Sequence, residues 1–150
     1  MLDHMILARR FVGLKEKPGH DVNAPLIMAM LTLDADWPSD DEVPWCAAYV
    51  NFVCWLAGVP RSTSLRARSW LLIGTPIETL ADAVEGDVVI LNRGGPQDPS
   101  IINAPGHVGF YLSHDMTFVH LLGGNQSNRV HEGAYPHINL LGIRRLTNGS

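Results

Sequence analysis

The hydrophobic pattern of this chain changes its period near residue 86, and that change limits the folds open to it. Before residue 86, apolar residues recur at helical spacing over 2–14 and 45–57. After it, short runs rich in β-branched and aromatic residues alternate with turn residues, as strands do. These runs cover 86–91, 106–112, 117–122 and 138–146. Helices followed by strands predict an α+β domain, with the N-terminal helices packed on an antiparallel sheet.

The best-defined predicted helix covers residues 45–57. Pro44 suits its first turn, where a missing N–H costs nothing, and Gly58 followed by Pro60 ends it. This apolar stretch is shorter than the roughly 20 residues that span a bilayer, so we expect a core helix and no membrane insertion. Shorter helical segments are expected over 25–31 and 66–72.

Composition places the chain among ordinary globular proteins. Its 150 residues are 46% hydrophobic and 17% charged, without an internal repeat or linker, so residues 1–150 are expected to form a single domain. A formal charge of -4 argues against a nucleic-acid partner, which favours a basic surface. The N-terminal residues lack the pattern of a signal peptide, so synthesis in the cytoplasm without one is expected.

The two cysteines share the helix predicted over 45–57 but differ in position. Cys46 lies in its first turn, where free N–H groups and the helix dipole stabilise a negative charge. We therefore expect Cys46 to be an activated thiolate. Cys54 lies among apolar residues about 12 Å further along the axis, too far for a disulfide, and is expected in the core.

A histidine and an asparagine complete a candidate catalytic set. His107 follows Pro105 and Gly106 at the opening of a strand, where a side chain can be held rigidly as a general base. The runs 106–112 and 117–122 are close enough to form a hairpin, which brings Asn125 beside His107. An amide there can fix the tautomer of the imidazole. Alternatively, Asn125 serves only the backbone of a Gly-Gly-Asn turn.

Five motifs in this order resemble a known superfamily: PWCAAYVNFV, ARSWL, GDVVIL, GHVGFYL and LLGGNQ. Together with the order of cysteine, histidine and polar residue, they look like the NlpC/P60 and CHAP superfamily of papain-like peptidoglycan hydrolases. More narrowly, they resemble a subfamily of short lysin-like proteins of phages and bacteria. The resemblance implies a papain-like fold and hydrolysis of an amide bond, either the N-acetylmuramoyl-L-alanine link or a bond within the stem peptide.

The resemblance also implies roles for individual residues. Cys46 corresponds to the nucleophile, His107 to the general base and Asn125 to the orienting residue, with His120 and Gln126 as rivals for the third role. For substrate binding, the candidates are Trp45, Arg68, Gln126 and Glu16. Arg66 and Arg68 either bind carboxylates of the substrate or only flank the indole of Trp70.

No metal or cofactor is expected. Five histidines (His107, His114, His120, His131 and His137) raise a zinc hydrolase as an alternative, although the sequence has no HExxH or CxxC motif. The acidic residues of 34–44 could form a calcium-binding loop, but a solvated acidic loop is the expected interpretation.

A wall-binding module without activity is a second alternative to a cysteine hydrolase. Peptidoglycan is the expected partner, either of a phage endolysin or of an antibacterial effector with an immunity protein, acting in the periplasm or cell wall of the target bacterium.

Overall fold

The computed structural model describes residues 2–14, 29–30, 33, 45–126 and 129–146, with the backbone alone at 125 and 126. Its α-helices are α1 (His4–Arg10) and α3 (Cys46–Ala57), and its 3₁₀ helices are η1 (Ala67–Leu72), η2 (Leu80–Asp82) and η3 (His137–Asn139). The strands are β1 (Thr75–Pro76), β2 (Val88–Asn92), β3 (Gly106–His114), β4 (Phe118–Gln126), β5 (Arg129–Pro136) and β6 (Leu140–Arg145).

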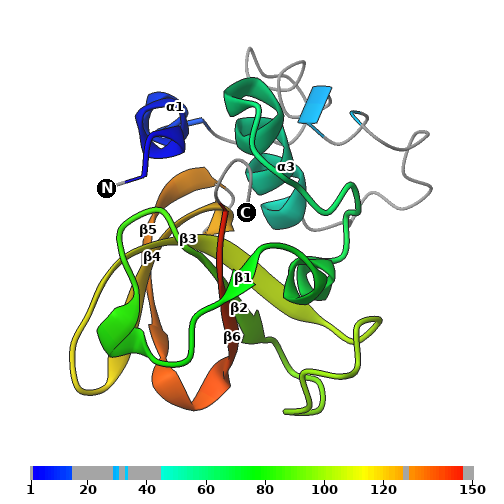
Figure 1. The fold of residues 1–150 in the computed structure, drawn as a ribbon, viewed down its shortest axis with the longest axis vertical. Helices are drawn as coiled ribbons and strands as arrows, with labels where there is room; N and C mark the ends of the chain where they lie inside the picture. The colour runs from blue at the N-terminus through cyan, green and yellow to red at the C-terminus, as the bar shows by residue number, and fades with distance from the viewer. Residues whose placement is uncertain (1, 15–28, 31–32, 34–44, 127–128, 147–150) are drawn as a thin grey trace.

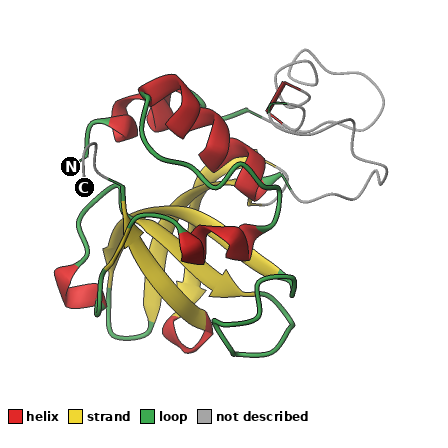
Figure 2. Cartoon of the chain, turned by 45° about the vertical axis from the view of Figure 1, so that its right-hand side comes forward, coloured by secondary structure: helices red, strands yellow, loops and turns green. Residues whose placement is uncertain are grey.

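The six strands form one antiparallel sheet in the order β1-β6-β2-β3-β4-β5. Both α-helices lie on the same side of this sheet (Figures 1 and 2). The predicted α+β class with an antiparallel sheet is therefore confirmed, as is the hairpin of β3 with β4. β1 and β5 were not predicted. The helix expected over 66–72 is present as the 3₁₀ helix η1, and most of the segment 25–31 lies outside the described residues.

Helix α3 lies at the centre of the larger apolar cluster and contributes many of its buried residues. Gly58 ends it in a left-handed conformation (φ 71°), and its N–H donates to the carbonyls of Cys54 and Trp55, as the glycine predicts. Eight of the twelve residues of α3 are buried. Among the described residues, no helix is long and apolar enough to cross a membrane.

The two faces of the sheet bury two separate apolar clusters. On one face, Val88, Ile90, Val108, Phe110 and Leu122 pack in the same cluster as α3. The opposite face carries a smaller cluster, formed by Val89, Leu91, Tyr111, Val119, Leu121 and Ile143, with Tyr135 packed against it. Adjacent strand residues thus alternate between the two clusters, as the period of two in a strand requires.

Polar contacts join α1 and β6 to the residues just before β2. His4 of α1 donates from Nε2 to the carbonyl of Gly86 at 2.6 Å. The fully buried carboxylate of Asp87 accepts two hydrogen bonds from Arg145 of β6, at 2.9 and 2.8 Å. A paired arginine satisfies the buried charge of Asp87, which would otherwise be costly to desolvate. This pairing holds β2 beside β6 and positions the strand that precedes the candidate site.

Candidate active site

Cys46 is the first residue of α3, and its side chain is directed at the beginning of β3. Hydrogen bonds from the backbone N–H groups of Val108 and Ala47 reach its sulfur. Val108 immediately follows His107, so the start of α3 and the start of β3 meet at the candidate nucleophile. Cys46 is only 1% exposed.

Burial determines the protonation of this cysteine. Removal from water raises the pKa of Cys46 and outweighs the hydrogen bonds from the backbone of Val108, Ala47 and Cys46 itself and the positive charge of Arg93, which act in the opposite direction. The expectation of a resting, activated thiolate is therefore not met, because a charge at a helix terminus is worth less here than full desolvation costs. The raised pKa favours the thiol form of Cys46, and attack by a thiol on a carbonyl requires a base that takes the proton. Burial likewise raises the pKa of Cys54, as expected for a core cysteine.

His107 lies second in β3 and is 4% exposed. Its ring stacks on Tyr135 of β5, with ring centroids 4.9 Å apart and an angle of 29° between the planes. β4 lies between β3 and β5 in the sheet, so the sheet curls enough for Tyr135 to reach across it. Charge on Cys46 adds to burial in raising the pKa of Tyr135, which places the phenol near the sulfur. Tyr135 was not among the residues predicted from the sequence.

The third candidate is described only through its backbone. Asn125 lies in β4 directly after Gly124, and a Cβ at Gly124 would come within 2.8 Å of both the Trp45 ring and the Tyr49 Cβ. The backbone of Asn125 thus lies at the corner where α3 begins. The side chains of Asn125 and Gln126 are outside the described residues, and the choice between them stays a prediction.

The rival His120 lies elsewhere. It pairs with Ser113 near the far end of the hairpin, and its Nε2 is 3.3 Å from Asp115 in the turn between β3 and β4. Four strand residues, or about 13 Å, separate it from Gly124. At this distance the imidazole of His120 is too far from the described start of α3 to orient a base there, and we no longer consider it for the orienting role.

The predicted substrate-binding residues have different locations. Trp45 is 2% exposed and packs on Gly124, which gives it a place in the core. Arg68 is fully buried, and each of its five N–H donors has a protein acceptor. The acceptors are the Asn92 side chain and the carbonyls of Pro96, Asp98, Ile101 and Pro105.

This arrangement corrects the expectation that Arg68 binds substrate. With every donor used, its guanidinium has none left for a ligand, and its role is to hold the loop between β2 and β3. Glu16, the other candidate, lies outside the described residues.

A pocket of about 410 Å³ opens beside Cys46. It is lined by Cys46, Leu65, Arg66, Ala67, Arg93, Asn103, Ala104, Pro105 and Gly106. Arg93 and Asn103 were not predicted, because nothing in their local sequence distinguishes them from other loop residues. The pocket gives the sulfur a route to ligands even though the side chain of Cys46 is almost fully covered.

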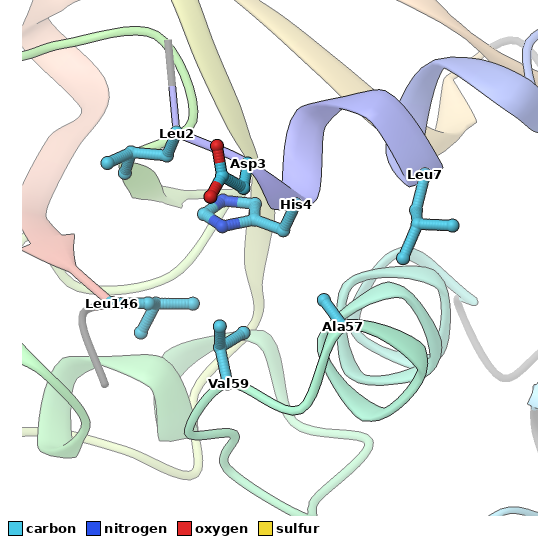
Figure 3. A pocket seen from close by; sticks show the side chains of 7 residues that line it. All are labelled: Leu2, Asp3, His4, Leu7, Ala57, Val59 and Leu146. Carbon is cyan, nitrogen blue, oxygen red and sulfur yellow. The ribbon is translucent and has the colours of Figure 1, made fainter. Parts of the chain in front are cut away.

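A second pocket, of about 400 Å³, lies at the other end of α3 (Figure 3). Asp3 and His4 are its polar lining side chains, and the other five lining residues are apolar: Leu2, Leu7, Ala57, Val59 and Leu146. Burial lowers the pKa of His4, which favours the neutral imidazole. A ring that already donates to the carbonyl of Gly86 is explained by folding, so we do not consider this pocket catalytic.

The histidines do not form a metal site where they are described. Among the described residues, no three His, Cys, Asp or Glu side chains are grouped so that they could hold a metal ion. The acidic segment 34–44, considered for calcium, lies outside that part of the chain.

Comparison with known proteins identifies the fold. No family model and no curated protein matches the chain. Among solved structures, it is similar to one titled "Structure of NlpC1 from Trichomonas vaginalis", with a TM-score of 0.58 and 17% sequence identity. The similarity covers 97% of this chain but 44% of that one, so the chain spans less than half the length of its neighbour. At this identity the likeness concerns the fold alone, and the chain has an NlpC-like fold.

Proposed function

We propose that the protein is a cysteine hydrolase of the papain-like NlpC/P60 type that cleaves an amide bond in peptidoglycan. The observation that carries the proposal is the meeting of two elements at one point. Cys46 begins α3, its sulfur accepts a hydrogen bond from Val108, and His107 is the residue before Val108. A pocket opens at the same sulfur. Nucleophilic catalysis requires a thiol, a base beside it and access for a substrate, and we propose His107 as that base because its backbone neighbour lies at the sulfur.

The reaction begins with transfer of the Cys46 proton to His107. The sulfur attacks the amide carbonyl, forming a C–S bond and a tetrahedral intermediate whose oxyanion is stabilised by backbone N–H groups at the start of α3. When the C–N bond breaks, the leaving amine takes the proton from the imidazolium of His107. Water, deprotonated by His107, then cleaves the thioester and restores the thiol. Asn125 is proposed to orient the imidazole, with Gln126 as the alternative.

The biological setting is part of the same proposal. We consider residues 1–150 a single catalytic domain that acts on the cell wall, either as a phage endolysin or as an antibacterial effector. As an effector, the protein would have an immunity protein as its partner. Recovery of a protein that binds the pocket tightly and blocks hydrolysis would distinguish the effector from the endolysin.

Mass spectrometry of digested peptidoglycan tests the proposed reaction. Purified wild-type protein should release fragments with new amino and carboxyl termini, which identify the cleaved amide, and Cys46→Ala should release none. His107→Ala should reduce the rate by about a hundredfold or more, the usual effect of losing a general base. If the wild-type protein binds the wall but releases no fragments, the proposal is wrong and the alternative of a wall-binding module gains support.

A further inference from the structure

The pocket at Cys46 has a distinctive charge. Two arginines line it, Arg66 just before η1 and Arg93 just after β2, and both are exposed. Asn103 adds a neutral polar side chain, and the remaining lining is apolar apart from Cys46 itself. The described lining thus contains two positive charges and no carboxylate. A pocket of this kind concentrates anions at the sulfur.

The wall that carries Arg93 and Asn103 is fixed from inside. Arg68 joins the loop between β2 and β3 through its five hydrogen bonds, and Asn92 adds hydrogen bonds to Gly95 and Gln97. The acidic residue in this loop, Asp98, is turned toward Ser100, whose N–H and hydroxyl donate to it at 2.9 and 2.7 Å. A loop held in this way presents its charges at defined positions, which selective binding requires.

Within the part of the chain that the structure describes, both guanidinium groups keep donors available. Arg66 donates to the carbonyl of Asn103 at 3.3 Å, which occupies one of its five N–H groups. Within the described parts of the chain, neither Arg66 nor Arg93 forms an ion pair with an acidic residue. Arg93 also acts electrostatically on Cys46 and on Tyr135, so its charge lies close to the reaction centre.

We propose that Arg66 and Arg93 form a subsite for a free carboxylate on the peptide substrate, close to the amide that is cleaved. The inference rests on the proposed function and specifies its substrate class as an acidic peptide. Arginine suits this role because its planar group of donors matches the two oxygens of a carboxylate. Amidation of that carboxylate removes the charge and replaces one acceptor oxygen with a donor, so the amidated peptide loses the charge attraction and keeps one of its two acceptors.

The test uses pairs of synthetic stem peptides that differ only in whether one side-chain or α-carboxylate is free or amidated. Wild-type protein should hydrolyse the free form with a kcat/KM at least about tenfold higher, the scale of one charge-assisted hydrogen bond. Arg66→Gln and Arg93→Gln should each reduce this preference, and Arg93→Lys should restore part of it. Arg10→Gln, which changes an exposed arginine on α1 outside the pocket, should keep it.

Binding separates this inference from the proposed function. With Cys46→Ala protein, calorimetry should show tighter binding of the free-carboxylate peptide, and Arg93→Gln in that background should remove the difference. If wild-type protein cleaves neither peptide but this binding difference exists, the hydrolase proposal is wrong and the subsite stands. If cleavage and binding are the same with the free and the amidated carboxylate, or if both variants slow the two peptides equally, the subsite is refuted.

Discussion

Tyr135 offers the sharpest test of how the catalytic base is held. Its ring stacks on His107 at 4.9 Å between centroids, and it reaches that histidine from a strand that is not adjacent in the sheet. In the proposed mechanism, His107 must accept the Cys46 proton and later donate it to the amine. A ring that rotates away performs neither step, so a residue that restricts the imidazole should contribute to the rate.

The expected magnitude follows from the contact. An aromatic pair is worth about 0.5–1.5 kcal/mol beyond the area that it buries. If this energy holds the imidazole in its productive orientation, Tyr135→Leu should lower kcat/KM by about two- to twelvefold, because about 1.4 kcal/mol corresponds to a factor of ten. Tyr135→Phe keeps the stacked ring and should stay close to the wild-type value.

The assay is the pH dependence of hydrolysis of a soluble stem peptide by each variant. If the His107 imidazole loses its orientation, the plateau value of kcat falls. A general loss of folding instead lowers the fraction of active protein, which is measured separately by active-site titration. Trp55→Leu is the matched control, since it removes an aromatic pair with Phe52 at 5.8 Å on an exposed part of α3. Its kinetics should not change. Wild-type rates for Tyr135→Leu, or equal losses for Leu and Phe, would refute the positioning role.

Three further predictions concern the scaffold. Gly124→Ala should lower the free energy of unfolding by about 1–3 kcal/mol in urea titration, because its Cβ would approach the Trp45 ring to 2.8 Å; unchanged stability would contradict the close packing of Trp45 on Gly124. Arg68→Lys should cost about 2 kcal/mol or more and speed proteolysis between β2 and β3, since an ammonium cannot replace five donors; wild-type stability would contradict this. Burial lowers the pKa of His4 below 6.5, so the unfolded chain binds more protons just below that pH, and stability should fall as the pH drops through 6.5. Urea titrations between about pH 7.5 and 5.5 should show this slope, and His4→Gln should reduce it.

Helix α3 and four strands were predictable because their signals are local. Gly58 adopts the left-handed conformation that few other residues tolerate, so the end of α3 is encoded at that position. The β-branched, aromatic and other apolar runs of β2, β3, β4 and β6 identify strands in the same way.

β5 lacks such a signal. Its sequence, Arg129–Pro136, includes a glutamate, a glycine and a terminal proline, and only one of its residues is buried. Pairing with β4 makes it a strand, and that tertiary contact cannot be identified from the segment alone.

The candidate site likewise contains residues that the sequence predicts and residues that only the structure reveals. Cys46 and His107 are recognisable because one opens a helix and the other follows a proline and a glycine at a strand start. Tyr135 and Arg93 depend on the curl of the sheet and on the path of a loop, for which no short motif exists. Arg66 and Arg68 lie two residues apart, yet the structure exposes one in the pocket and buries the other completely. A sequence of alternating arginines does not reveal which of them faces inward.

The assignment of the nucleophile is the central claim, and the two cysteines of α3 provide its most direct test. Both are buried in the same helix, yet only Cys46 lines the pocket beside β3. Hydrolysis of purified peptidoglycan should be measured for Cys46→Ala and Cys54→Ala after both variants are shown to fold. We predict that the rate of Cys46→Ala falls to background while Cys54→Ala retains most of the wild-type rate. Equal losses, or full activity without Cys46, would contradict it.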